Sequence, residues 1–268
     1  MMPQATMPKY LTVKQEAKNG SAEMYIDGAI VTDEWEDSDT SAAGFRDALK
    51  SLGDVKNINL HINSPGGSVF EGIAIYNMLK QHSAQVNVYV DGLAASIASV
   101  IAMSGDAIFM PSNAMMMIHN PWTYAMGNAN QLRKQADDLD QITKSSIQTY
   151  LAKAGDKLDE DTLKDLMDNE TWLTAQEAVD YGLADEVMEA NKAAASIDRR
   201  FAERYLHVPK QLLTNISQNA QEPDMAKKLS KEKLKQIRET AKANAFAVSI
   251  NLQNLEEDIK YGSLRNED

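Results

Sequence analysis

Apolar and polar residues alternate along several short segments of this chain, and segments with helical spacing follow most of them. The alternation is clearest over residues 58–63, where every second side chain is apolar, as is typical of a half-buried strand. Strands are predicted over residues 22–30, 58–63, 86–90, 107–110 and 114–118. Helices are predicted over residues 41–52, 69–79, 97–103, 128–154, 163–167 and 174–179. Strands that alternate with helices indicate an α/β layered fold with much parallel pairing.

Several predicted helix boundaries carry their own chemical signals. Ser41 precedes an apolar helical pattern and is a suitable N-cap. Thr174, followed three residues later by Glu177, is the pattern of a capping box. Gly155 ends the long pattern over 128–154, as glycine commonly does at a helix C-terminus.

The pattern divides the chain into three parts. Residues 1–20 are polar and predicted to be loose, and residues 21–190 hold the alternating strands and helices of one folded domain. Residues 191–268 are predicted to form a flexible, partly helical C-terminal tail, with a polar linker over 191–224. A helix is predicted over 231–248, too polar to form a core alone, so we expect it to pack against a partner or stay dynamic.

Composition narrows the class of protein. The chain has 268 residues, 43% of them hydrophobic, which suffices for one substantial core. It has no cysteine, which excludes disulfides and thiolate metal sites, and we expect no metal and no cofactor. Without an apolar run near the ~20 residues of a membrane span, and without a signal-peptide pattern, we expect a cytoplasmic protein with no membrane partner.

The charge is unevenly distributed. Residues 191–268 hold 14 basic and 11 acidic residues, so this part has a net charge of +3 and the first 190 residues have −15. So acidic a domain repels nucleic acid, and we expect no nucleic-acid partner.

Ser96 is the first candidate for chemistry. It lies between the predicted strand 86–90 and a helix rich in small residues, where free backbone N–H groups favour a developing anion. The alternative is that Ser96 is simply the N-cap of that helix.

His119 and the segment Ser64-Pro65-Gly66-Gly67 complete a candidate constellation. A serine nucleophile needs a base, a carboxylate to orient that base and N–H donors for the oxyanion. His119 lies at the end of the predicted strand 114–118 and has a suitable pKa range, while glycine N–H groups suit the oxyanion. Each piece also has a structural alternative, a strand-end histidine and a turn. Of the other three histidines, His82 and His207 are poor candidates, and His61 is expected at a surface or interface.

Four ordered motifs together resemble the proteolytic subunit of the Clp protease family of serine peptidases. They are INSPGG at 62–67, GLAAS at 92–96, MIHNP at 117–121 and WLTAQEAVDYGL at 172–183. The segments AASIASVIAM at 94–103, GNA at 127–129 and ETW at 170–172 most resemble the Clp-like head maturation proteases of tailed phages and prophages.

This resemblance implies a crotonase-like stack of ββα units, with residues 128–154 as the long "handle" helix between rings. It implies that Ser96 is the nucleophile and His119 the general base. The backbone N–H groups of Gly67 and Ile97 would form the oxyanion hole, and residues 66–69, including Gly66 and Ser68, would line the peptide groove.

The carboxylate of the triad is where the sequence departs from the family pattern. The resemblance implies an aspartate two residues before Trp172, but this chain has Glu170 there. Glutamate can orient a histidine with one more methylene of reach, so we expect Glu170 in this role. Asp168 is the alternative.

The resemblance also implies a homo-oligomer, a heptameric ring or paired rings, that acts on polypeptides. For the head maturation branch these are capsid precursor, scaffold and the enzyme's own tail, cut without an ATPase partner, in the host cytoplasm and the procapsid. Alternatives are a non-enzymatic ring that organises capsid assembly, a host-type Clp peptidase that degrades unfolded proteins, and an acyl-CoA enzyme of the crotonase superfamily.

Overall fold

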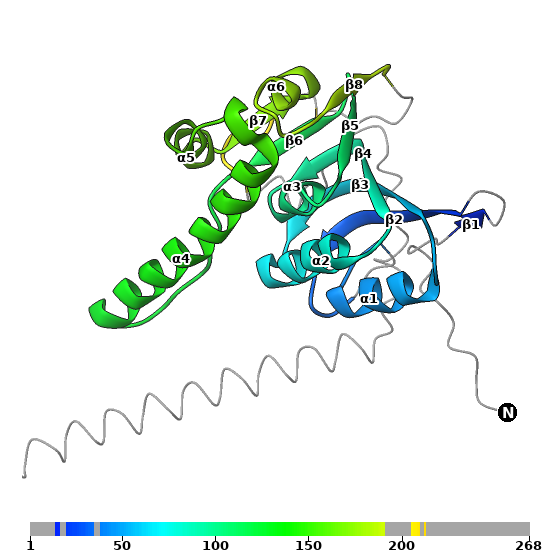
Figure 1. The fold of residues 1–268 in the computed structure, drawn as a ribbon. Helices are drawn as coiled ribbons and strands as arrows, with labels where there is room; N and C mark the ends of the chain where they lie inside the picture. Colours follow the sequence, from blue (N-terminus) through cyan, green and yellow to red (C-terminus); the bar gives the residue numbers. More distant parts are fainter. Residues whose placement is uncertain (1–13, 17–19, 35–37, 191–204, 210–211, 213–268) are drawn as a thin grey trace, which may run out of the picture. The chain divides into compact units, whose positions relative to one another are not determined.

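A computed structural model describes residues 14–16, 20–34, 38–190, 205–209 and 212, which form one sheet with helices along it (Figure 1). The strands are β1 Lys14–Glu16, β2 Ser21–Ile30, β3 Asn57–Gly67, β4 Gln85–Ala95, β5 Ala107–Pro111, β6 Met115–Ile118, β7 Thr171–Thr174 and β8 Glu186–Met188. The helices are α1 Ala42–Ser51, α2 Val69–Gln81, α3 Ile97–Ala102, α4 Ala129–Ala154, η1 Gly155–Lys157, α5 Glu160–Asp168 and α6 Ala175–Asp180. The α/β prediction is confirmed.

The sheet is mostly parallel and branches at β4. Its order is β1-β2-β3-β4-β5-β8, and β6 pairs with both β4 and β7. The first half of β4 pairs with β5, from Asn87 to Tyr89, and its last residues pair with β6, where Ala95 lies opposite Met117. β4 therefore carries its carboxyl end, and Ser96 after it, away from β5 and alongside β6.

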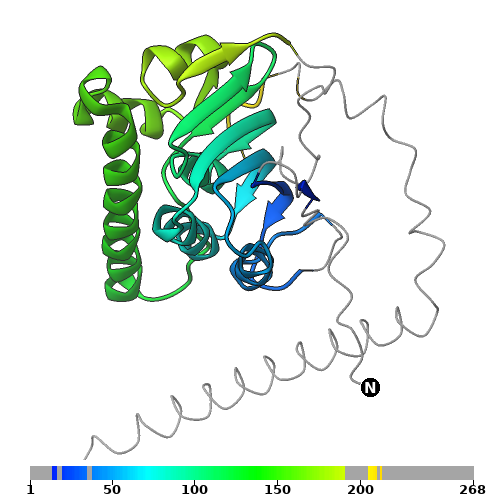
Figure 2. The same cartoon turned by 45° about the vertical axis from the view of Figure 1, so that its right-hand side comes forward.

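One face of the sheet is covered by α1, α2 and α3, and Figures 1 and 2 show these helices on the same side. Phe45 and Leu49 of α1 are buried, as the predicted apolar face requires, and every residue of α3 is buried. At Gly72 of α2, a Cβ would lie 2.2 Å from Ile97 Cγ1, so only glycine permits this approach of α2 to α3. The start of α3 is thus fixed by packing as well as by β4.

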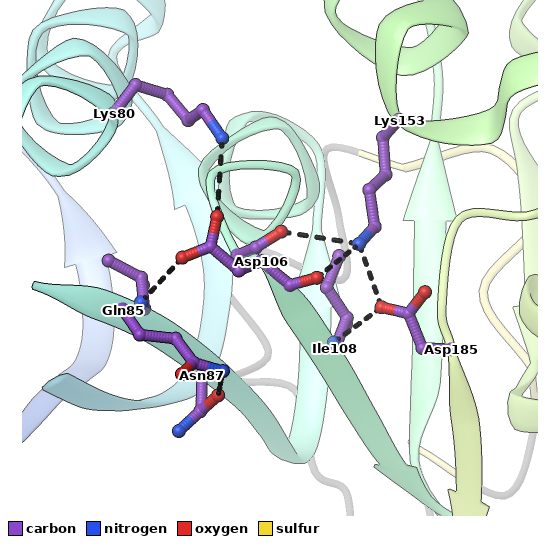
Figure 3. Close-up of polar contacts among 9 residues, drawn as sticks. Lys80, Gln85, Asn87, Asp106, Ile108, Lys153 and Asp185 are labelled. Atoms are coloured by element: carbon purple, nitrogen blue, oxygen red, sulfur yellow. Dashed lines mark hydrogen bonds and ion pairs between the residues drawn. The ribbon is translucent and has the colours of Figure 1, made fainter. Parts of the chain in front are cut away.

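Helix α4 extends away from the sheet and is anchored at its C-terminal end (Figures 1 and 2). Asn128 caps it in a full capping box, and burial is confined to its second half, at Ser146, Ile147, Tyr150 and Ala154. Lys153 ion-pairs with Asp185 at 2.8 Å, and Asp185 also accepts a hydrogen bond from the N–H of Ile108 at 2.7 Å (Figure 3). This contact fastens α4 to the amino end of β5.

Three details differ from the pattern-based prediction. Residues 14–16 are not loose but form β1, because they pair antiparallel with β2, Lys14 opposite Glu23. The segment 64–67 is not a free turn but the end of β3, since Gly66 and Gly67 pair with Ala29 and Ile30 across a register shift. β7 and β8 were not predicted, because such short strands show no clear period.

The predicted tail lies outside the described residues, except for 205–209 and 212. Within the part of the chain that the structure describes, no helix is long and apolar enough to cross a membrane.

Candidate active site

Ser96 occupies a strained turn between β4 and α3. Its φ of 55° and ψ of −128° lie in a region that non-glycine residues rarely adopt, which is the signature of a nucleophile at a strand-to-helix turn. Its N–H donates to the carbonyl of Met117 at 2.9 Å, which ties the turn to β6. Ser96 occupies the N-cap position of α3, as the alternative expected, but its side chain makes no capping hydrogen bond, so the hydroxyl is not used to cap the helix.

His119 follows β6 directly and faces the serine. Because Ala95 and Met117 are partners in the sheet, the residues after each strand lie side by side. The distance from His119 Nε2 to Ser96 Oγ is 2.8 Å, a hydrogen bond in which the hydroxyl donates when the imidazole is neutral. Burial lowers the pKa of His119, while the negative charge of Glu170 acts in the opposite direction. Burial therefore favours the neutral imidazole, the form that can accept a proton.

Glu170 is the buried carboxylate of this region. It lies at the turn between α5 and β7 with a φ of 48° and is 7% exposed. Its charge acts on His119, but no hydrogen bond joins the two side chains in the described part of the chain. Oε1 of Glu170 instead accepts a hydrogen bond at 2.8 Å from the backbone N–H of His207.

Asp168, the alternative carboxylate, is bonded elsewhere. Its Oδ1 accepts a hydrogen bond from Asn120 Nδ2 at 2.6 Å in an exposed environment. Of the two carboxylates, it is Glu170 whose charge bears on the pKa of His119. The geometry therefore favours Glu170 over Asp168 as the acid behind the histidine.

The glycines at the end of β3 lie against the serine turn. A Cβ at Gly66, whose φ is 88°, would lie 2.6 Å from the carbonyl oxygen of Ala95 and 2.8 Å from Ser96 Cβ. Gly66 is buried, and Gly67 beside it is exposed, so the backbone of Gly67 is open to a substrate. The N–H of Ser68 donates to the carbonyl of Ile30 at 2.8 Å and is not available to a peptide.

Ile97, the other predicted oxyanion donor, is the first residue of α3. Its backbone N–H belongs to a helix start, where donors have no intrahelical partner. A Cβ added to Gly66 would lie 3.2 Å from this nitrogen, so the β3 end and the α3 start meet at Ser96. The arrangement suits a negative charge that forms on a carbonyl carbon attacked by Ser96.

The side chains of Ser64, Ser99 and Tyr150 support the site in roles that the sequence did not predict. Ser64 Oγ donates to the carbonyl of Gly28 at 2.6 Å and accepts from the N–H of Gly66 at 3.1 Å, which holds the β3 end in place. Ser99 Oγ donates to the carbonyl of Ser96 at 2.5 Å and bonds with Tyr150 Oη at 2.7 Å. These contacts join α4 to the serine turn. The sequence offered one signal for these contacts, a second serine, Ser99, three residues after Ser96.

A small pocket opens beside the Ser96–His119 pair. Its lining includes the apolar side chains of Val69, Ile97, Val100 and Pro121 and the hydroxyl-bearing side chains of Ser146 and Tyr150. Burial raises the pKa of Tyr150, so its hydroxyl is neutral. The pocket suits an apolar side chain next to the attacked carbonyl.

Comparison with known proteins agrees with this geometry. Residues 16–191 match the Clp protease family. The chain is 39% identical over 139 residues to the protein described as "ATP-dependent Clp protease proteolytic subunit" of Ligilactobacillus salivarius (strain UCC118). That similarity covers 51% of this chain and 70% of the relative. These comparisons identify the family without singling out the phage head maturation branch. The chain therefore belongs to the Clp protease family and is a serine peptidase.

Proposed function

We propose that this chain is a serine endopeptidase in which Ser96 is the nucleophile, His119 the general base and Glu170 the orienting carboxylate. The observation that carries the proposal is the 2.8 Å contact between His119 Nε2 and Ser96 Oγ at a strained strand-to-helix turn. A cap or core serine needs neither the strain nor the neutral histidine beside it.

The proposed reaction follows from these positions. Ser96 Oγ attacks the peptide carbonyl carbon while His119 Nε2 takes the hydroxyl proton. The carbonyl oxygen becomes an oxyanion that accepts hydrogen bonds from the N–H groups of Gly67 and Ile97. His119 then gives its proton to the leaving amine, the C–N bond breaks and an acyl ester remains on Ser96. Water, deprotonated by His119, hydrolyses that ester. The negative charge of Glu170 stabilises the imidazolium formed in both halves of the cycle.

The substrate is an extended polypeptide. The exposed end of β3 at Gly67 offers backbone groups to which a peptide can add as a strand, whereas the N–H of Ser68 is already bonded to Ile30. The small pocket that Val69 and Val100 help to line offers a place for part of a substrate side chain beside the cleaved bond.

Membership of the Clp protease family supports assembly into an oligomeric ring. The relative from Ligilactobacillus is described as ATP-dependent, and this favours a Clp peptidase subunit that degrades unfolded proteins in the cytoplasm with an ATPase partner. ATP-independent processing of capsid precursor and scaffold is the alternative. The support for this alternative is the C-terminal segment 192–268, which the family match does not include. Cleavage of unfolded casein that needs an added unfoldase and ATP supports the first, and Ser96-dependent trimming of capsid precursor supports the second.

Labelling with a fluorophosphonate tests the chemistry directly. Wild-type protein is expected to label on Ser96, and Ser96→Ala is expected to lose the label. Ser112 is exposed in the turn between β5 and β6, so Ser112→Ala is the matched control and is expected to label normally. A wild-type protein that does not label, or a Ser96→Ala variant that does, contradicts the proposal.

A further inference from the structure

Residues 205–209 and Leu212, which we call the C-terminal strap, lie against the candidate site. They are far from it in sequence and beyond the family match, which ends at residue 191. Leu212 is 2% exposed and packs in a small apolar cluster with Leu93, Ala95 and Met117, at the ends of β4 and β6. Val208 packs against the same cluster. The strap is thus anchored on the two strand ends that carry Ser96 and His119.

Tyr205 covers the histidine from one side. Its ring meets the ring of His119 edge to face, with centroids 5.6 Å apart, and that of Trp172 at 5.8 Å. Its hydroxyl donates a hydrogen bond to the carbonyl of Pro65, in the β3 end next to Gly66. A single side chain of the strap therefore touches both the base and the strand that supplies the oxyanion site.

The strap also provides a hydrogen-bond donor to the buried carboxylate. The N–H of His207 lies 2.8 Å from Glu170 Oε1. A carboxylate that is 7% exposed needs hydrogen-bond donors to replace water, and a donor on one oxygen restricts the orientation of the other. The His207 side chain is exposed, so it is the backbone group that acts here.

We propose that the C-terminal strap is a positioning element of the catalytic triad: the His207 N–H holds Glu170, and Tyr205 holds the His119 ring. This inference rests on the proposed function. The pocket beside Ser96 is lined by side chains of α2, α3 and α4, by Ser96, and by His119 and Pro121 after β6; no described residue of the strap lines it, so a substrate side chain still has access. The Ser96–His119 hydrogen bond is also intact with the strap in place. Both facts favour support of the site over its blockage.

Proline at position 207 tests this inference, because it removes the N–H donor, while His207→Ala keeps it. His207→Pro is expected to lower kcat for peptide hydrolysis by about 10- to 100-fold with KM nearly unchanged, since a misplaced triad group slows the chemical step. His207→Ala is expected to stay within about twofold of wild type. Because Glu170 raises the pKa of His119, the acid limb of kcat/KM is expected at lower pH in His207→Pro.

A second variant and a second measurement guard against a folding artefact. Leu212→Ala loosens the anchor without touching the triad and is expected to lower kcat in the same direction. Amide hydrogen exchange at His207, whose N–H is bonded to Glu170, is expected to be slow in wild type and fast in Leu212→Ala. Rates of peptide hydrolysis that rise in both His207→Pro and Leu212→Ala overturn the inference in favour of a blocking segment. Unchanged rates and pH profiles, or a strap that exchanges rapidly in wild type, also overturn it. These results leave Ser96 labelling intact, whereas failure of the proposed function removes labelling from wild type itself.

Discussion

His61 lies within β3 and His119 directly follows β6 of the same sheet, yet their surroundings shift their pKa values in opposite directions. His61 lies in the middle of β3, where Nδ1 is 2.9 Å from Asp91 Oδ1 and Nε2 is 3.1 Å from Glu23 Oε2. Ionised carboxylates only accept hydrogen bonds, so this arrangement favours a proton on both ring nitrogens. Burial lowers the pKa of His61, but the hydrogen bonds to Asp91 and Glu23 outweigh it and raise the pKa.

His119 shows the reverse arrangement. Burial has the larger effect and lowers its pKa. The charge of Glu170 acts at a distance and offsets part of this shift. One ring nitrogen faces a hydroxyl that can give up a proton. The comparison teaches that carboxylates on both nitrogens favour the cationic form of a histidine, whereas burial beside a serine favours the neutral form, which can accept a proton. Proximity to carboxylates alone would have selected the wrong histidine.

Substituting each of the two histidines in turn is expected to give the largest difference in kcat/KM. His119→Gln removes the base and is expected to lower kcat/KM for peptide hydrolysis by about 10⁴-fold or more. His61→Gln removes a surface ion pair and is expected to leave kcat/KM within about twofold. Initial rates with a fluorogenic peptide measure both. Comparable losses in the two variants would contradict the assignment of roles.

The carboxylates near His119 give the next largest effect. Glu170→Gln is expected to lower kcat/KM by about 10²- to 10⁴-fold, since the imidazolium loses its counter-charge. Its acid limb is expected at lower pH than that of wild type, because Glu170 raises the pKa of His119. Wild-type activity itself is expected to fall as pH drops through a pKa below the ordinary ~6.5 of histidine. A pH series of kcat/KM measures all three.

Asp168→Asn is the matched control for Glu170→Gln. Asp168 bonds to Asn120 in an exposed environment, so its neutral isostere is expected to change kcat/KM by less than about threefold. If Asp168→Asn were the more damaging variant, the carboxylate behind His119 would have been misidentified.

Local signals along the chain predict much of this site, and contacts between distant segments account for the rest. Strand ends followed by Ser96 and by His119 could be placed from hydrophobic alternation, and parallel pairing then brings them together. The bond between Glu170 and the His207 N–H could not be predicted, because the donor is a backbone group in a polar segment with no periodicity. The pairing of Gly67 with Ile30 was missed for a related reason, since the register shift between β2 and β3 leaves no mark on the hydrophobic pattern of either strand.

The same limit applies to the surroundings of His61. Its ring stacks between Tyr25 and Tyr89, with centroids 4.7 Å and 5.1 Å away, and Tyr89 stacks on Phe109. These residues are direct partners across β2, β3, β4 and β5. Each strand was predicted, but the row exists only in one register, and single-strand patterns do not fix register.

The smallest expected effect concerns the stability that His61 contributes. Because its pKa is raised in the folded state, that stability is fully present below the unfolded value of ~6.5 and is lost as pH rises through the folded pKa. His61→Phe keeps an aromatic ring in the stack but removes the cation. It is expected to lower the free energy of unfolding by about 1 kcal/mol at pH 6, or Tm by roughly 2–4 °C. At pH 9 the deficit is expected to shrink.

Tyr89→Phe controls for the stack, because it changes a neighbouring ring without changing a charge between these pH values. Its effect on Tm is expected to be the same at pH 6 and pH 9, while that of His61→Phe is larger at pH 6. Thermal unfolding of the three proteins at both pH values measures the difference. A loss of Tm in His61→Phe that is the same at both pH values would show that His61 acts through packing alone. His61 and His119 would then differ in their burial and not in their charge. A deficit confined to low pH ties the carboxylates Asp91 and Glu23 to a cation at this position.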